Sequence, residues 1–546
     1  MKLKHLLVAF GAIGLFFVST SFGQSYAITD ARIVTVSGTP IEKGTVVIRD
    51  GLIQSVGADV KAPADAQIFD GTGLTVYPGF FDTLTTLGLQ SPAAPAARTP
   101  GGPQVSASPA ASNSNYPAGL RPEALAADDL KAGEAQFEAS RNAGFTTVVT
   151  VGRTGIFNGQ SAIIDLAGES TSAMIVKAPF AEHVSFNTIG GGQYPGSLMG
   201  TFSSMRQMFL DAQRLRQIQK MYDANPRGMK RPDADASLEA LIPILDRKIP
   251  VVFNANREIE IIRALDFAKE FNLRALIAGG QEAWKVADRL KAQDVPVLLS
   301  LNFPKRTAAA STEADSDSMD LLRFRAETPK GAARLAQAGV KFAFQSGGLT
   351  SIGDYFNNGG KAVEDGLSKD AAIKAMTLGA AEILGIADRT GSIETGKIAN
   401  LTVVRGDLLG KDRTVVHVFV DGKYFEQKPP AKQPAGAATP TGAAPAFANV
   451  GGNFSIIIEV PGQTLTGTLA MTQQAAVLTG TMQTQVGTSA IKDGKVTAEG
   501  FTFSSTVDYA GSTIEIVVKG TVTGNQISGM IDSPQGTIPF SGTRNP

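Results

Sequence analysis

Neutral polar side chains follow several apolar segments of this sequence, at points where the strands of a parallel sheet would end. The first such segment, residues 74–81, runs directly into Asp82, Thr83 and Thr85. Later apolar segments are followed by further amides and a hydroxyl: Asn254, Asn256, Gln281 and Ser346. Carboxamides and hydroxyls donate and accept hydrogen bonds without carrying charge. Together these residues predict a pocket that hydrogen-bonds a small polar ligand; the alternative is that they satisfy one another and ordered water.

The elements that position these residues alternate between strands and helices. Short apolar runs predict strands at residues 251–254, 274–279, 295–300 and 340–346, with helical periodicity between them. Strands that alternate with helices form parallel βα units. With two earlier apolar strands, these units predict an α/β fold of the closed, TIM-like (βα) barrel type, in which chemistry gathers at the carboxyl ends of the strands.

Four segments carry a family resemblance. They are the motif Pro78-Gly79-Phe80-Phe81-Asp82, the strand at residues 144–148, the helix end at 377–385 and the strand pair at 391–404. In residue type and order they resemble the amidohydrolase superfamily, in particular its exported imidazolonepropionase-like members. The resemblance implies a TIM-like barrel over residues 74–389. It also implies a small discontinuous β-sandwich built from residues 26–73 and 390–427.

The resemblance further implies a hydrolase of carbon–nitrogen bonds other than peptide bonds, with Zn²⁺ or another divalent metal that activates water. Its histidine ligands on the first strand are matched here to Thr83 and Thr85, and those after a later strand to Asn254 and Asn256. Gln281 stands where a further histidine is implied. The segment that contains Ser346 stands where an aspartate is implied.

The histidine count agrees with a lost metal centre. The sequence has 3 histidines and no cysteine, and one histidine, His5, lies in the N-terminal leader. The other two, His183 and His417, are far apart in the sequence, whereas a zinc site usually takes three or four protein ligands. We therefore predict no metal and no other cofactor, and we expect the Thr83 and Thr85 hydroxyls to face Asn254 at the barrel mouth.

The two ends of the chain indicate export and an additional domain. Residues 1–23 combine Lys2 and Lys4 with an apolar run and small residues, which predicts a signal peptide and a periplasmic or secreted bacterial protein with no membrane span after cleavage. Residues 91–121 are rich in Pro, Ala, Ser and Gly and predict a disordered loop, either a lid or a solvated insertion. Residues 428–447 predict a Pro/Ala linker, and residues 448–546 a β-rich domain that closes as a barrel or sandwich.

Three functions remain open at this point. The first is a catalytically inactive amidohydrolase relative, a pseudoenzyme that binds a small polar ligand or a protein partner. The second is an active amidohydrolase with an atypical centre, and the third is an envelope interaction protein that acts through its C-terminal β-domain. Lys plus Arg and Asp plus Glu both number 50, so charge gives no reason to expect nucleic acid as a partner. A homo-oligomer is compatible with each of these functions.

Overall fold

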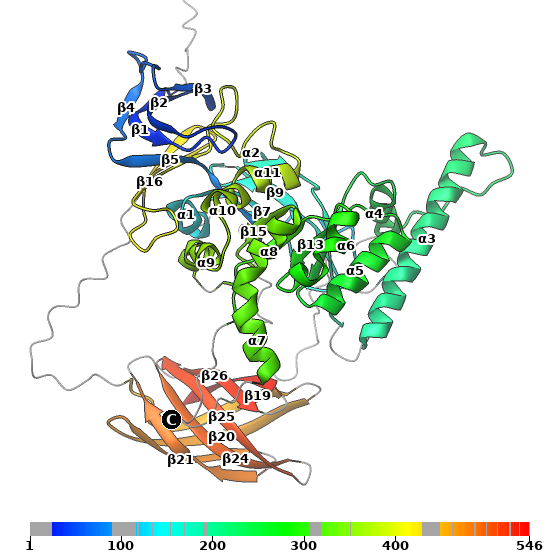
Figure 1. Cartoon of the computed structure of the whole chain (residues 1–546). Coiled ribbons are helices and arrows are strands. Elements are labelled where there is room, and N and C mark those ends of the chain that lie inside the picture. The colour runs from blue at the N-terminus through cyan, green and yellow to red at the C-terminus, as the bar shows by residue number, and fades with distance from the viewer. Residues whose placement is uncertain are drawn as a thin grey trace, which may run out of the picture. The chain divides into compact units, whose positions relative to one another are not determined.

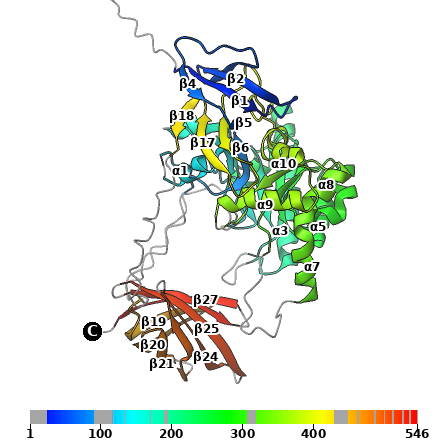
Figure 2. The ribbon, with the colours of Figure 1, turned by 60° about the vertical axis from the view of Figure 1, so that its left-hand side comes forward.

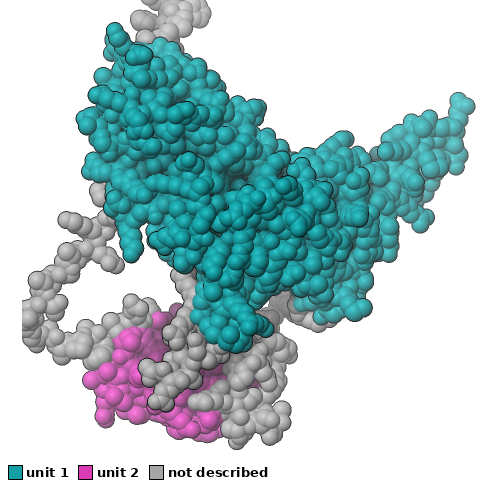
Figure 3. Space-filling view, viewed as in Figure 1, with its two compact units in different colours: residues 1–189, 193–428 teal, residues 190–192, 429–546 magenta. Residues whose placement is uncertain are grey.

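The computed structural model describes most of the chain. The described residues are 24–89, 116, 119–133, 135–152, 154–168, 170–188, 194–304, 318–349, 351–427, 448–460, 463–484, 487–497, 500–509, 512–523, 526–533 and 536–544. The predicted signal peptide and linker, and most of the predicted loop at 91–121, therefore lie outside the described residues. The chain divides into two compact units, residues 1–189 with 193–428, and residues 190–192 with 429–546 (Figure 3).

An eight-stranded sheet in the larger unit joins two segments that are far apart in sequence. Its strands are β1 (Tyr26–Ile33), β2 (Ile41–Arg49), β3 (Leu52–Gly57), β4 (Gln67–Asp70), β5 (Leu74–Pro78), β16 (Leu401–Arg405), β17 (Thr414–Val420) and β18 (Lys423–Glu426). The two segments meet where β5 pairs antiparallel with β16, with Leu401 opposite Pro78. Tyr26, Leu401 and Phe419 share one buried core. This arrangement confirms the small discontinuous β-domain predicted from the sequence.

The remaining strands of the larger unit surround a common interior. They are β6 (Phe80–Thr85), β7 (Phe145–Thr150), β8 (Phe157–Gln160), β9 (Ala162–Asp165), β10 (Ile175–Lys177), β11 (Glu182–Ser185), β12 (Val251–Ala255), β13 (Ala275–Gly279), β14 (Val297–Ser300) and β15 (Phe342–Gln345). β6 and β7 are parallel, and so are β11 to β15 in order. β15 lies beside β6, where Thr83 Oγ1 donates to the Phe344 carbonyl oxygen at 2.9 Å. The result is the barrel-like α/β core that the sequence predicts.

One position in this barrel-like core is antiparallel, which the sequence did not predict. β8 and β9 form nearly one strand that is interrupted at Ser161, with β9 antiparallel to β7 and β8 antiparallel to β11. Only residues 151–156 separate β7 from β8. A parallel neighbour needs a crossover of a dozen or more residues, so this short connection reverses the chain.

Helices cover the outside of the strands (Figures 1 and 2). They are α1 (Ala135–Asn142), α2 (Thr171–Met174), α3 (Leu198–Ala224), α4 (Ala236–Leu245), α5 (Glu258–Glu270), α6 (Ala287–Ala292), α7 (Met319–Glu327), α8 (Gly331–Ala338), α9 (Gly353–Glu364), α10 (Lys369–Met376) and α11 (Leu378–Leu384), with 3₁₀ turns η1 (Ala283–Val286) and η2 (Thr328–Lys330). Thr377 separates α10 from α11, because its φ of −136° and ψ of −103° are not helical. Within the described residues, none of the helices has the length and apolarity needed to cross a membrane.

The first barrel strand depends on a close approach at Gly79. The Gly79 amide donates to the Asn400 carbonyl oxygen at 2.8 Å, which ties the barrel to the β-domain. A Cβ at Gly79 would lie 2.2 Å from Thr146 Oγ1 and 2.3 Å from Thr146 Cγ2. Thr146 is fully buried, so its side chain has little room to move aside.

Gly79→Ala is therefore expected to destabilise the larger unit by about 2–3 kcal/mol, because overpacking in a dense core forces side chains out of their rotamers. Thermal unfolding measures the change. Adding Thr146→Ala should restore part of the loss, since it removes the two nearest atoms. Gly38→Ala is the control, because its nearest neighbour, Thr35 Oγ1, lies 3.7 Å away. Equal stability of Gly79→Ala and the unmodified chain would contradict the expectation.

The smaller unit is a closed antiparallel barrel. Its strands are β19 (Gly452–Val460), β20 (Gln463–Gln474), β21 (Val477–Thr484), β22 (Gly487–Ala490), β23 (Lys492–Val496), β24 (Phe501–Tyr509), β25 (Ser512–Thr523), β26 (Gln526–Ser533) and β27 (Gly536–Arg544). Eight strands close the barrel in the order β20-β19-β27-β26-β25-β24-β23-β21, because β21 also pairs with β20. Phe454, Leu469, Phe503 and Phe540 lie in its core. The predicted C-terminal all-β domain is confirmed.

Candidate ligand-binding site

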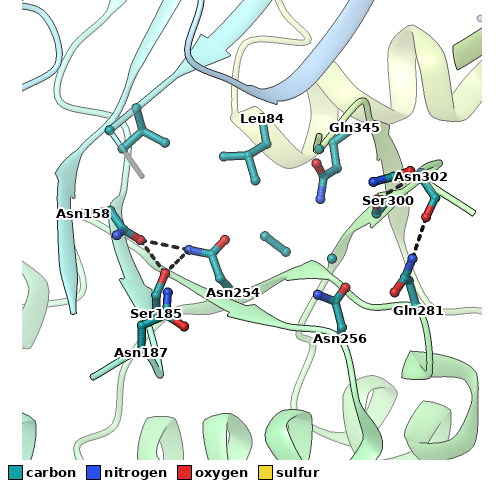
Figure 4. Close-up of a pocket in the computed structure, with 15 residues that line it drawn as sticks. Leu84, Asn158, Ser185, Asn187, Asn254, Asn256, Gln281, Ser300, Asn302 and Gln345 are labelled. Atoms are coloured by element: carbon teal, nitrogen blue, oxygen red, sulfur yellow. Dashed lines mark hydrogen bonds between the residues drawn. The ribbon is translucent and has the colours of Figure 1, made fainter. Parts of the chain in front are cut away.

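A cavity of ≈ 320 Å³ lies at the carboxyl ends of the barrel strands (Figure 4). Its walls carry seven carboxamides and two serines. These polar residues are Asn158, Ser185, Asn187, Asn254, Asn256, Gln281, Ser300, Asn302 and Gln345. Among the described residues no acidic, basic or histidine side chain lines the cavity. The cavity can therefore form many hydrogen bonds but supplies no charge.

The two-residue period of the strands separates an apolar floor from these polar walls. On β12, Val252 belongs to the apolar cluster inside the barrel, and Asn254, two residues later, lines the cavity. On β14, Leu298 and Ser300 are related in the same way. Leu384 of α11 belongs to the same apolar cluster. Alternate side chains of a strand point to the same face, so the fold places Asn254 and Ser300 each one layer above an apolar residue.

A hydrogen-bond network fixes one side of the cavity (Figure 4). Asn158 Nδ2 donates to the carbonyl oxygens of Thr154 and Gly155 at 3.2 and 3.1 Å. Asn158 Oδ1 accepts from Ser185 Oγ at 2.7 Å and from Asn254 Nδ2 at 3.0 Å. Asn254 Nδ2 also donates to Ser185 Oγ at 3.0 Å. Among the described residues, every polar group of these three side chains except Asn254 Oδ1 thus has a hydrogen-bond partner.

A second set of hydrogen bonds fixes the opposite side. Gln281 Nε2 donates to the Asn302 carbonyl oxygen at 2.7 Å, and the Asn302 amide donates to Ser300 Oγ at 3.1 Å. Gln345 is 2% exposed, and its Nε2 makes a long contact of 3.4 Å with the Leu298 carbonyl oxygen. Gln345 Oε1 is buried and has no hydrogen-bond partner among the described residues.

The structure brings Asn254, Asn256 and Gln281 together on the cavity wall but does not place Thr83 or Thr85 there. Both hydroxyls serve the barrel wall instead: Thr83 bonds to Phe344 as described, and Thr85 Oγ1 donates to the Val149 carbonyl oxygen at 3.2 Å. The expectation that these two hydroxyls face Asn254 is therefore wrong.

The physical reason is a bulge in β6. Asp82 lies opposite Val148 and Thr85 opposite Thr150, so β6 has one more residue than β7 over this stretch. Such a bulge shifts the alternation of side chains. As a result Leu84, which the sequence reading did not select, lines the cavity.

Asp82 and Ser346, also expected in the pocket, do not line it. Asp82 is 1% exposed, and its Oδ1 accepts from the Ser346 amide at 2.9 Å and from the Leu84 amide at 3.4 Å. The aspartate thus joins the end of β15 to the bulge of β6. We infer a positioning role for this carboxylate.

Several lining residues were missed from the sequence. Ser300 and Asn302 follow the apolar run at 295–300, and the rule that selected Asn254 would have selected them. Asn158, Ser185 and Asn187 gave no comparable signal, because they lie in a segment without regular strand–helix alternation. They reach the cavity only through the antiparallel strand β8 and its neighbour β11.

Comparisons with known proteins agree with this geometry. The sequence profile of the Amidohydrolase family matches residues 318–424. A solved amidohydrolase from Thermotoga maritima MSB8 is 25% identical with a TM-score of 0.62, over 73% of this chain and 100% of that chain. Residues 318–424 of the larger unit thus match the Amidohydrolase family, and the fold of this unit is similar to that of a solved amidohydrolase. We call the larger unit the amidohydrolase-like domain.

Two other solved structures show lower similarity to the chain. A prolidase complexed with N-methylphosphonate-L-proline is 17% identical with a TM-score of 0.45, over 74% of this chain and 100% of that chain. An adenosine deaminase from Xanthomonas campestris with bound Zn is 16% identical with a TM-score of 0.43, over 76% of this chain and 95% of that chain. No curated protein sequence matches the chain.

The donors in the cavity of the amidohydrolase-like domain do not fit a divalent metal. Zn²⁺ takes histidine, thiolate or carboxylate ligands, and Mg²⁺ and Ca²⁺ need carboxylates. The cavity offers amides and hydroxyls. Within the described ranges, no three His, Asp or Glu side chains gather as a metal site.

The two histidines of the domain lie outside the cavity. His183 is fully buried on β11, and its Nε2 lies 2.9 Å from Ser161 Oγ. Burial lowers the pKa of His183 to about 3, so the ring is neutral near pH 7. His417 packs edge-on against Phe69 in the β-domain, with a ring separation of 4.8 Å. Neither histidine lines the cavity.

Proposed function

We propose that the amidohydrolase-like domain binds a small polar ligand in the amide-lined cavity and does not hydrolyse it. The observation that carries the proposal is the wall of seven carboxamides and two serines, with no titratable side chain among the described lining residues. When a ligand enters the cavity, the lining groups lose their hydrogen bonds to water. A ligand binds only if its own polar groups replace those hydrogen bonds. The proposal makes the chain a pseudoenzyme within a family of hydrolases.

Hydrolysis of a carbon–nitrogen bond requires an activated water. Proteins activate water with a metal ion or with a general base whose pKa lies near the working pH. The cavity walls supply neither, because carboxamides and hydroxyls do not accept a proton near pH 7. His183 cannot act as that base from the cavity, since it lies outside the lining and bonds to Ser161.

We further propose that the protein acts outside the cytoplasm, in the periplasm or as a secreted protein. The basic start and apolar run of residues 1–23 support this location. The lack of cysteine means that the fold needs no disulfide in an oxidising compartment.

Ligand-observed NMR of the full chain with acetamide, glycerol and 1,3-dimethylurea tests binding and hydrolysis together. We expect saturation transfer to at least one probe, with every probe remaining intact. Asn254→Ala should weaken this binding by roughly tenfold, because it removes a fixed cavity acceptor. Asn357→Ala is the matched control, since Asn357 is exposed on α9 and does not line the cavity. Release of acetate from acetamide, lost in Asn254→Ala, would contradict the proposal.

A further inference from the structure

We infer that the amide-lined cavity selects a ligand that donates hydrogen bonds at both of its ends, such as a urea, an amine or a guanidine, over one that only accepts. The inference rests on the proposed function, because it names the ligand class of the same cavity. It follows from which atoms of the lining amides already form hydrogen bonds within the protein and which remain for a ligand.

On one side of the cavity, two backbone carbonyl oxygens, which can only accept hydrogen bonds, determine how the amide side chains are oriented. Those of Thr154 and Gly155 face the Asn158 amide group, so the nitrogen of that group must point to them. Asn158 Oδ1 is then an acceptor, and it holds the NH₂ group of Asn254. The same NH₂ group donates to Ser185 Oγ. Asn254 therefore has its NH₂ committed and only its Oδ1 left over, as an acceptor, in the wall of the cavity (Figure 4).

On the other side of the cavity, a third backbone carbonyl likewise binds the NH₂ group of an amide side chain and leaves the amide oxygen for a ligand. The Asn302 carbonyl oxygen accepts from Gln281 Nε2 at 2.7 Å, a short hydrogen bond that fixes the amide plane. Within the described part of the chain, Gln281 Oε1 has no hydrogen-bond partner and is the atom left for a ligand. The cavity thus has an oriented amide oxygen on each of two opposite sides (Figure 4).

The other amides do not offset this preference. No hydrogen bond to a described residue holds the side chains of Asn187 and Asn256, so either can turn its oxygen or its nitrogen toward a ligand. Asn254 and Gln281 resist turning, because a turned side chain would place its oxygen against Asn158 Oδ1 or the Asn302 carbonyl oxygen. A ligand that only accepts leaves both fixed oxygens unpaired, whereas a ligand with N–H groups at both ends satisfies them.

Two ureas, which each carry one carbonyl group but differ in their N–H donors, test the inference. 1,3-Dimethylurea has two N–H donors and tetramethylurea has none. In titrations of the full chain followed by NMR, we expect dimethylurea to bind at least roughly tenfold more tightly. Asn158→Leu removes the acceptor that holds Asn254, so the difference between the two probes should shrink. Asn357→Ala should leave the difference unchanged.

The outcomes separate the inference from the proposed function. If tetramethylurea binds as tightly as dimethylurea and Asn254→Ala weakens both, the cavity binds ligands but the donor preference is wrong. If neither urea nor methylguanidine, acetamide or glycerol binds, the proposed function fails as well. Gln281→Met removes the acceptor on the other side, and it provides the same test if Asn158→Leu does not fold.

Discussion

Replacing Asp82 by alanine is expected to lower the free energy of unfolding of the amidohydrolase-like domain by about 3 kcal/mol, because a buried acceptor of two amide donors is removed. The side chain is 1% exposed and links the Ser346 amide after β15 to the Leu84 amide in the β6 bulge. Both amides would lose an acceptor whose side chain is buried. Chemical denaturation, with the transitions of the two units resolved, measures the change.

Two further variants show whether the carboxylate itself is responsible. Asp82→Asn keeps an oxygen for the Ser346 amide and should cost less than half as much as alanine. Asp59→Ala is the control, since Asp59 is exposed and such surface changes usually stay within about 0.5 kcal/mol. An Asp82→Ala domain as stable as the unmodified one would show that the link between β6 and β15 does not depend on this residue.

The contribution of Asp165 to the stability of the domain is expected to fall as the pH rises from about 4 to about 8. Burial, and then the nearby carboxylate of Asp421, raise the pKa of Asp165 from 3.8 to about 8. The acid also accepts hydrogen bonds from Thr147 Oγ1 at 2.5 Å and from Asn400 Nδ2 at 3.2 Å. These bonds oppose the shift but do not cancel it.

The direction follows from proton linkage. Unfolded Asp165 loses its proton near pH 3.8, whereas folded Asp165 keeps it up to about pH 8. The stabilisation is therefore complete below the unfolded pKa and is lost as the pH rises through the folded pKa, at up to about 1.4 kcal/mol per pH unit. Burial also raises the pKa of Asp421, while Lys423 and Arg389 oppose that shift and favour its charged form. We therefore expect that, of these two carboxyl groups, Asp165 carries the proton.

Denaturation of the full chain at pH 5 and pH 8 measures this effect. Asp165→Asn should flatten the dependence and gain stability relative to the unmodified chain at pH 8, because the asparagine side chain is neutral at both values. Asp407→Asn is the control, since the pKa of Asp407 is lowered, mainly by its hydrogen bond with Lys369. Parallel pH profiles for Asp165→Asn and the unmodified chain would mean that Asp165 does not hold the proton.

Most of the fold could be predicted because its signals are local. The strands β12 to β15 are short apolar runs between amphipathic helices, and this periodicity is readable from one sequence. The antiparallel strand at residues 157–165 could not be predicted in the same way. Its direction depends on the short connection from β7 and on its pairing with β11, which is distant in sequence.

The site was harder to predict because its geometry depends on register. Asn254 and Gln281 follow apolar strands without interruption, and the structure places both on the cavity wall. Thr83 and Thr85 follow their strand equally closely, but the bulge of β6 turns Leu84 inward in their place. A bulge is defined by the pairing of two strands, so one strand's sequence does not reveal it.

The most direct test of the account is the metal content of the full chain, purified without chelators after expression with Zn²⁺ and Mn²⁺ supplied. We expect far less than one metal ion per chain, because the described cavity walls carry amides and hydroxyls instead of histidines and carboxylates. Binding of 1,3-dimethylurea should be the same before and after treatment with a chelator. One tightly held Zn²⁺ or Mn²⁺ per chain, removed by the chelator together with amide hydrolysis, would contradict the central claim.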